Sequence, residues 1–275
     1  MLNKALDREP APPSMADQAD RHLLYQESVQ CVEAEIDFVD DTFKRLRNRH
    51  ARTLREDFCG TGNTSCEWVR RRTSNLALGV DLDSEVLAWG EQHNRKALGT
   101  QAKRLTLLEA DVRKVEGEPV DVLLAMNFSY WIFKQRRQLR HYFSRAREAL
   151  VDDGIFFLDM YGGYHSGKEM KEKTKNDGFT YIWHQAHYNP INADMHCHIH
   201  FKFPDGSRLR KAFSYSWRLW TLPEVTELLE EAGFRKVTVY WQGWDEKLEE
   251  ANGDFTAVTE ADADPAWICY LTAEK

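Results

Sequence analysis

Short apolar runs and amphipathic stretches alternate along the middle of the chain. Leu76–Asp81 and Val120–Met126 are largely apolar, which is typical of strands buried on both faces of a parallel sheet. Between such runs apolar residues recur with helical spacing, as over Gln135–Leu150. This alternation predicts a parallel sheet with helices on both faces. The five strands predicted in this part are Thr53–Asp57, Leu76–Asp81, Leu105–Glu109, Val120–Met126 and Ile155–Met160.

The pattern changes after the fifth predicted strand. The segment from Lys168 to Gly178 is charged, and we expect a solvated loop or a surface helix there, with a mobile gate as the alternative. Three further stretches with turn residues between them predict a small antiparallel sheet inserted into the α/β fold. These stretches are Phe179–His187, Met195–Phe203 and Arg208–Trp217.

The last part of the chain returns to the central sheet. Thr221 and Glu224 form a capping-box pattern that opens a helix. Phe234–Trp241 and Trp267–Thr272 are the sixth and seventh predicted strands, and the acidic residues 244–265 are predicted to form a loop between them. The predicted fold class is α/β: a Rossmann-like, seven-stranded, mostly parallel sheet with helices on both faces, plus N-terminal helices and the antiparallel insertion.

The N-terminal part has helical spacing of apolar residues from Leu24 to Phe43, which predicts one or two helices. They are either packing helices or a lid over a ligand, with Tyr25 and Gln26 beside it. The residues before them contain three prolines and predict a mobile tail. The predicted organisation is a tail over 1–20, a helical lid over 21–49, a core over 50–165, an inserted sheet over 166–217 and the rest of the core over 218–275.

Composition narrows the function classes. The chain has 275 residues, a net charge of −7 and a pI near 5.8, which argues against a dedicated nucleic-acid binder. No apolar run approaches the roughly 20 residues that span a bilayer, and the N-terminus has no signal-peptide pattern. The five cysteines are scattered without CxxC spacing, which favours reduced thiols and a cytoplasmic location.

The stretch Leu54–Asn63 carries the clearest chemical signal. It has the pattern of a strand end, a turn with Gly60 and Gly62, and a helix start that Asn63-Thr64-Ser65 would cap. A glycine turn after the first parallel strand is a usual place for a nucleotide cofactor. Asp81 ends the second strand about twenty residues later, where a carboxylate can accept hydrogen bonds from both ribose hydroxyls.

With its neighbours, this stretch resembles motif I of the class I S-adenosylmethionine (SAM) methyltransferases, acid-x-Gly-x-Gly-x-Gly. Glu56 takes the acid position, and Gly60 and Gly62 take the last two glycine positions. Phe58 replaces the first glycine, which implies either a wider turn or a side chain that turns away from the ligand.

Two later loops extend the resemblance. It implies that Asp111 binds the adenine amino group, that the N–H of the next residue faces the adenine ring, and that the loop from Asn127 lies beside the methionine part. An NAD(P) site would need a third glycine where Ser65 stands. The expected cofactor is therefore SAM, and the residues predicted to bind it are Glu56, Cys59, Gly60, Thr61, Gly62, Asp81, Leu82, Asp111, Val112 and Asn127.

Methyl transfer from SAM is an in-line displacement, so the protein must supply position and a deprotonated acceptor. Tyr130, Trp131 and Tyr161 follow the fourth and fifth strands, where they are either aromatic walls beside the sulfonium or ordinary core residues. His165 or Tyr161 is the expected base for an amine acceptor. The predicted catalytic residues are Tyr130, Tyr161 and His165.

His196, His198 and His200 share one face of a predicted strand. No carboxylate completes a ligand set with them, so we expect no metal, and a polar strand face or a wall of the acceptor pocket is preferred.

The inserted sheet resembles the acceptor-side insertion of small-molecule N-methyltransferases. This implies a small-molecule acceptor, an amine or a hydroxyl, with no nucleic-acid or membrane partner; a homodimer stays open. Two alternatives remain. One is an NAD(P)-dependent oxidoreductase, and the other is a catalytically silent SAM-binding protein of the same fold, which Phe58 keeps open.

Overall fold

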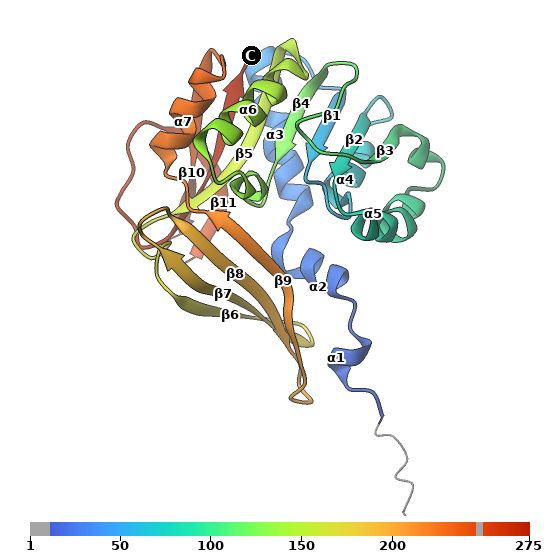
Figure 1. The fold of residues 1–275 in the computed structure, drawn as a ribbon. Helices are drawn as coiled ribbons and strands as arrows, with labels where there is room; N and C mark the ends of the chain where they lie inside the picture. The colour runs from blue at the N-terminus through green and yellow to red at the C-terminus, as the bar shows by residue number, and fades with distance from the viewer. Residues whose placement is uncertain (1–11, 246–249) are drawn as a thin grey trace, which may run out of the picture.

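The computed structural model describes residues 12–245 and 250–275. A large sheet, covered by helices, stands above a smaller sheet (Figure 1). The strands of the large sheet are β1 (Thr53–Asp57), β2 (Leu76–Asp81), β3 (Leu105–Glu109), β4 (Val120–Ala125), β5 (Leu150–Gly162), β10 (Lys236–Asp245), β11 (Glu250–Val258) and β12 (Trp267–Glu274). Its main helices are α3 (Val32–Arg47), α4 (Asn63–Arg71), α5 (Ser84–Gly90), α6 (Arg136–Glu148) and α7 (Leu222–Glu231).

The large sheet has the strand order β11-β10-β12-β5-β4-β1-β2-β3. β1 to β5 pair in parallel, and β12 runs antiparallel between β5 and β10. The seven predicted strands are present. An eighth, β11, lies within residues 244–265, so the prediction of a loop there was wrong for this part. β11 pairs with β10 at the sheet edge and is mostly exposed, so its sequence shows no apolar alternation.

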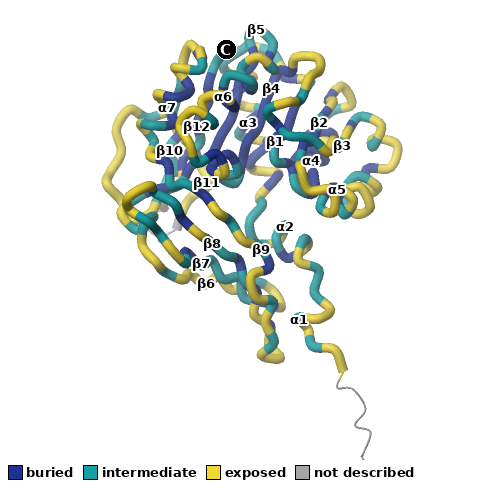
Figure 2. Tube along the Cα trace, viewed as in Figure 1, coloured by how far each residue is buried: buried dark blue, intermediate teal, exposed yellow. Residues whose placement is uncertain are grey.

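Helices bury both faces of the large sheet, as predicted. Alternate residues of β4 show this: Val122 and Leu124 pack with α3 and α4, and Leu123 packs with α6 and α7. Figure 2 shows the central strands as the most deeply buried part of the molecule. None of the helices in the described part of the chain has the length and apolar character that a membrane crossing requires.

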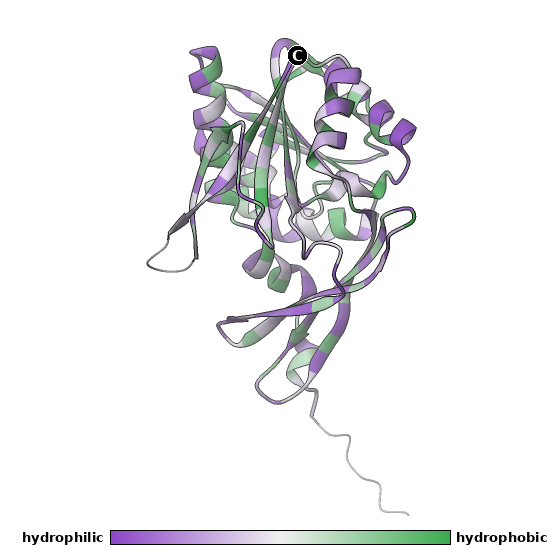
Figure 3. Cartoon of the chain, turned by 90° about the vertical axis from the view of Figure 1, so that its left-hand side faces the viewer, coloured by the Kyte–Doolittle hydropathy of each residue, from purple (hydrophilic) through white to green (hydrophobic). Residues whose placement is uncertain are grey.

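The smaller sheet is the predicted antiparallel insertion, with one strand more than expected. Its order is β6 (Met170–Asn176), β7 (Phe179–Asn189), β8 (Asp194–Lys202) and β9 (Arg208–Arg218). The prediction of a loop or surface helix before Gly178 was wrong, because β6 is a strand. Most of its residues are exposed, so it lacks the apolar alternation that would reveal it. Hydrophobic and hydrophilic residues alternate along the other strands (Figure 3).

The N-terminal helices divide into two roles. α3 is a core element, since Ile36, Val39 and Phe43 are fully buried, so the predicted lid cannot include it. α2 (Arg21–Val29) lies instead beside β9 (Figure 1). The predicted tail falls partly on residues 1–11, outside the described residues. Its later part contains α1 (Met15–Gln18), whose backbone N–H groups bind the side chains of Asp205 and Ser207.

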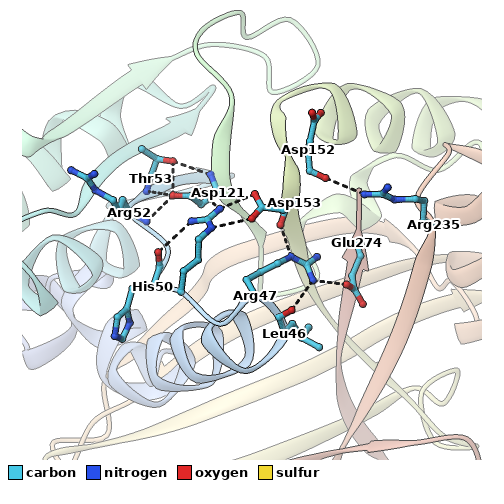
Figure 4. Close-up of polar contacts among 11 residues, drawn as sticks. Leu46, Arg47, His50, Arg52, Thr53, Asp121, Asp152, Asp153, Arg235 and Glu274 are labelled. Carbon is cyan, nitrogen blue, oxygen red and sulfur yellow. Dashed lines mark hydrogen bonds and ion pairs between the residues drawn. The ribbon is translucent and has the colours of Figure 1, made fainter.

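A polar network closes the end of the sheet opposite the glycine turn (Figure 4). Asp121 at the second position of β4 accepts hydrogen bonds from the backbone N–H groups of Arg52 (2.7 Å) and Thr53 (3.0 Å). The guanidinium of Arg49 donates to its other oxygen (2.8 Å). Burial alone would raise the pKa of Asp121, but these hydrogen bonds outweigh burial and lower it. The carboxylate therefore joins β1, β4 and the residues after α3.

We expect Asp121→Asn to lower the free energy of unfolding by about 1–3 kcal/mol, because hydrogen bonds to a charged group are lost. The folded-state pKa is lowered, so the stabilisation is present at neutral pH and is lost as the pH falls below the ordinary aspartate value. Urea unfolding at several pH values should show the difference between variant and parent vanishing in acid. Asp152→Asn is the control, since Asp152 is exposed and binds Arg235 through its backbone carbonyl. Equal losses in both variants would contradict this role.

Candidate cofactor and acceptor cavities

The turn after β1 is held by backbone contacts to β2. The N–H of Cys59 donates to the carbonyl of Val80 (2.9 Å), and the N–H of Gly60 donates to the carboxylate of Asp81 (2.8 Å). A Cβ on Gly60 would have no atom within 4 Å, whereas a Cβ on Gly62 would lie 2.8 Å from the side chain of Leu107. Gly60 thus leaves space open for a ligand, and Gly62 allows close packing of the turn on β3.

Phe58 adopts the left-handed conformation that a glycine would adopt more easily, with φ of 58°. That conformation costs a non-glycine residue about 1–2 kcal/mol. The ring packs against Phe133 and Tyr142, with ring centroids 6.0 and 5.6 Å apart. Of the two outcomes that the sequence left open, the side chain therefore packs away from the turn, and it leaves a cavity beside Gly60 open.

Glu56 is buried and caps α4 from the neighbouring strand. Its carboxylate accepts hydrogen bonds from the N–H (2.8 Å) and the hydroxyl (2.5 Å) of Ser65. The prediction that Asn63-Thr64-Ser65 would supply the cap was wrong: Gly62 is the N-cap residue and has no side chain to offer. Burial raises the pKa of Glu56 to about 8 and that of nearby Glu35 to about 7.

Asp81 lies at the end of β2, where a ribose acceptor was predicted. Besides the N–H of Gly60, its carboxylate accepts the N–H of Asp83 (3.0 Å). Asp83 in turn caps α5 by accepting from the N–H groups of Glu85 and Val86. The carboxylate of Asp81 therefore fixes both loops that border the cavity.

Four other residues that were predicted to bind the cofactor are Cys59, Leu82, Asp111 and Val112. Cys59 is buried with a raised thiol pKa, so it fills space rather than reacts. Leu82 is 64% exposed beyond the strand end. Asp111 is held by both ends of the Arg113 guanidinium, which lowers its pKa to about 2, and Val112 is buried. Leu82, Asp111 and Val112 line neither of the two cavities described below, so their roles toward adenine stay predictions.

The first cavity, of about 520 Å³, opens beside the glycine turn. Its walls come from the turn, from the ends of β1, β2 and β4, and from two segments that cover it, α2 and β9. The lining residues include Glu56, Gly60, Thr61, Asp81, Asp83 and Asn127. Carboxylates at two strand ends and a glycine with free space above it fit a nucleoside-type cofactor with cationic groups, such as SAM.

α2 lies over this cavity, where the lid was predicted. The side-chain amide of Gln26 donates to the hydroxyl of Thr61 (2.8 Å), and His22 and Tyr25 line the cavity. On the other side, the ring of Tyr25 packs against Phe213 of β9 (4.9 Å). The placement agrees with the prediction, and whether α2 opens and closes stays a prediction.

A second cavity, of about 320 Å³, lies between the large sheet and the inserted sheet. Its walls are mostly aromatic, and its polar residues include Asn127, His165, Ser166, Glu172, Gln185 and Gln242. Tyr25, Asn127 and Tyr215 line both cavities. The two spaces therefore meet at these three residues.

The three predicted catalytic residues lie in different environments. Tyr130 was placed wrongly: it is fully buried, and its hydroxyl donates to the carbonyl of Asp159 (3.0 Å), because the short helix Ser129–Ile132 turns it into the core. Tyr161 and His165 both line the second cavity. Burial raises the pKa of Tyr161, so the hydroxyl stays protonated at neutral pH and is not a base.

The histidine face of β8 points away from the second cavity, so it does not line an acceptor pocket. His200 Nδ1 accepts the backbone N–H of Lys211 (3.0 Å), which places the proton of the neutral ring on Nε2, 3.3 Å from Nδ1 of His184. A protonated Nε2 is not a metal ligand. Among the described residues no group of three His, Cys, Asp or Glu side chains is placed to hold a metal ion.

Comparison with known proteins identifies the fold. No family model matches the chain. A curated protein of Geobacillus sp. (strain WCH70), named "Putative methyltransferase", is 21% identical over 78% of this chain and 87% of its own length. A SAM-dependent methyltransferase structure from Clostridium acetobutylicum has a TM-score of 0.68 at 16% identity and covers 92% of this chain and 96% of its own.

Two further structures carry more specific names. CalS10 of Micromonospora echinaspora, an amino pentose methyltransferase, has a TM-score of 0.63 at 14% identity over 90% of this chain and 95% of its own. KedS8 of Streptoalloteichus sp., a sugar N-methyltransferase, has a TM-score of 0.60 at 15% identity over 98% of both chains. This chain therefore has the class I SAM-dependent methyltransferase fold, which confirms the fold that the sequence predicted.

Among the cavity residues that the sequence analysis did not identify as site residues are Tyr215, Glu172 and Trp183. All lie on the inserted sheet. The alternation along β7 and β9 is visible in the sequence, but nothing local indicates which of their faces meets the core, and β6 has no such alternation.

The raised pKa of Glu56 predicts pH-dependent binding of a cationic cofactor. In the free protein Glu56 is protonated below pH about 8. A cation in the first cavity favours the carboxylate, so binding should release a proton, and SAM affinity should rise as the pH increases toward that value. Calorimetry at pH 6 to 8, in buffers of different ionisation enthalpy, measures the release of the proton. Glu56→Gln should abolish the dependence; its persistence in that variant would assign the proton elsewhere.

The contact between α2 and the glycine turn should also contribute to cofactor affinity. Gln26→Ala removes the hydrogen bond to Thr61 and should weaken SAM binding by about threefold to tenfold, the value of one hydrogen bond. Gln18→Ala is the matched control, since its amide binds the carbonyls of Pro13 and Ser14 beside its own helix. Unchanged affinity in the Gln26 variant would rule out this contact as part of the site.

Proposed function

We propose that this protein is an enzyme that transfers the methyl group of SAM to an amine nitrogen of a small molecule. Methyl transfer from SAM is what the fold and the relatives support. The amine acceptor is inferred from the chemistry of the second cavity.

One observation carries the proposal: the two cavities share Tyr25, Asn127 and Tyr215. A group-transfer enzyme needs a donor site and an acceptor site that meet at the transferred atom. The first cavity has the strand ends and the glycine turn that suit SAM. The second has the size of a small molecule rather than of a nucleic acid or a protein segment.

An amine is favoured over a hydroxyl by the walls of the second cavity. Eight aromatic residues line it: Tyr25, Phe128, Tyr161, Tyr181, Trp183, Tyr215, Trp217 and Trp267. Aromatic faces attract a cationic amine before it reacts. Two of the similar structures also have N-methyltransferase or amino-sugar activity in their names.

Methyl transfer from SAM requires little of the protein beyond holding the donor and the acceptor in position. SAM supplies an electrophilic methyl group, which the nitrogen lone pair attacks while the carbon–sulfur bond breaks and its electrons go to sulfur. The residues shared by the cavities hold the nitrogen in line and exclude water. A protonated amine must first lose a proton, and we assign His165 as its acceptor because it lines this cavity while Tyr161 stays protonated.

The test is a reaction of purified protein with SAM and matched pairs of small amines and alcohols. Mass spectrometry of the products should show methylated amines and unchanged alcohols. Methylation of alcohols alone would contradict the amine assignment. Saturable binding of NAD without SAM would favour the oxidoreductase, and SAM binding with no turnover would favour the silent protein.

His165→Gln should lower kcat by about 100-fold, the lower range of general-base contributions, and leave the Kd for SAM unchanged. The loss should shrink at high pH, where the amine is deprotonated in solution. His196→Gln is the matched control, because His196 lies on the exposed outer side of β8. Full activity of the His165 variant at neutral pH would show that the proton leaves by another route.

A further inference from the structure

The face of the inserted sheet toward the second cavity carries one charged residue. Along β6, β7, β8 and β9 the lining residues of this face are Met170, Glu172, Tyr181, Trp183, Gln185, Ile199, Tyr215 and Trp217. All but Glu172 are apolar, aromatic or neutral. The whole cavity has no lysine or arginine in its lining. Glu172 is exposed, so its negative charge lies at the solvent side of this space, where no lysine or arginine of the lining opposes it.

The carboxylate of Glu172 faces the aromatic walls. Its charge contributes to the raised pKa values of the Tyr161 and Tyr181 hydroxyls, after burial as the main cause. Glu172 pairs across the strands with Trp183, so the two side chains lie on the same face. None of the ion pairs formed by the described residues involves Glu172.

Glu172 lies at the end of the cavity away from the cofactor. A row of paired residues crosses the sheet from Glu172 through Trp183 and Ile199 to Phe213. The first three line the second cavity, and Phe213 lines the first. Adjacent strands lie about 4.8 Å apart and three such spacings separate β6 from β9, so Glu172 and the cofactor side of the sheet are separated by about 14 Å. β6 and β9 are the two edges of this sheet in Figure 1.

We propose that Glu172, with the aromatic faces beside it, binds a positively charged group of the acceptor other than the atom that is methylated. The inference rests on the proposed function. It names the substrate class: an elongated molecule with a reactive amine at one end and a second cationic nitrogen roughly ten to twelve bonds away, a length set by the three strand spacings. The absence of lysine and arginine from the lining makes a phosphorylated acceptor a poor fit.

A structural role on the edge strand β6 could also explain why a charged residue stands at position 172. β6 is an edge strand, and charged side chains on edge strands prevent pairing with other chains. Lys171, Lys173 and Lys175 already serve that purpose on the same strand. A protective role needs no specific ligand, so binding measurements separate the two explanations.

The experiment uses the full chain saturated with S-adenosylhomocysteine and titrates choline by calorimetry. The comparison probe is dimethylbutanol, the uncharged alcohol in which carbon replaces the choline nitrogen. We expect choline to bind more tightly than dimethylbutanol. Glu172→Gln should weaken choline binding roughly fivefold to tenfold and leave dimethylbutanol unaffected, as a cation site of this kind implies.

Glu169→Gln is the matched control. Glu169 precedes β6, is exposed, faces His187 and does not line the cavity. If both substitutions weakened choline binding equally, the effect would come from the general negative charge of the surface. That result would overturn the proposal. So would equal affinity of the parent protein for choline and dimethylbutanol.

A kinetic comparison tests whether the cationic group that Glu172 binds is distant from the nitrogen that is methylated. Terminal alkyl diamines should show a lower KM than monoamines of equal length, with similar kcat, and Glu172→Gln should remove the difference. No difference in the parent protein would overturn the second-cation assignment. Failure of S-adenosylhomocysteine to bind would contradict the proposed function itself, whereas its binding without discrimination between the probes contradicts this inference alone.

Discussion

The geometry of both cavities depends on the buried carboxylate of Asp159 near the end of β5. It accepts the backbone N–H groups of Asn127 (2.8 Å) and Phe128 (2.9 Å), which both adopt left-handed conformations. Two such residues in succession cost about 1–2 kcal/mol each, so the turn persists because charge-assisted hydrogen bonds hold it. Burial raises the pKa of Asp159 to about 7, against the effect of these two hydrogen bonds. The turn places Asn127 between the cavities and packs Phe128 against Tyr161.

The sequence predicted the parts of the site that follow from strand order. The carboxyl ends of parallel strands meet at one edge of a sheet, so the sequence alone predicts that Asp81 and Asn127 lie near the glycine turn. The cap on α4 could not be predicted in the same way. Residues 63 to 65 are suitable cap residues by local rules, but Glu56 from the adjacent strand occupies that position. Local rules fail where a buried side chain from another element competes.

The prediction of the other site residues was limited because the sequence does not show in which direction their side chains point. Tyr130 follows Asn127 by three residues, yet a short helix turns it into the core. Glu172 lies in a strand of alternating charges that has no apolar pattern to mark its inner face. Asp111 was predicted to meet adenine, and its carboxylate is already held by Arg113 two residues later. In each case the deciding contact depends on packing that a single sequence does not display.

The two shared tyrosines have a thermodynamic consequence. Tyr25 comes from α2 and Tyr215 from β9, and the side chains interact with each other while lining both cavities. A ligand that orders this pair in one cavity removes part of the entropy cost that a ligand in the other would meet. By linkage, each ligand then raises the affinity for the other by the same factor. Under the proposed function, the inserted sheet and the N-terminal helix α2, which carry this tyrosine pair, would couple the two cavities.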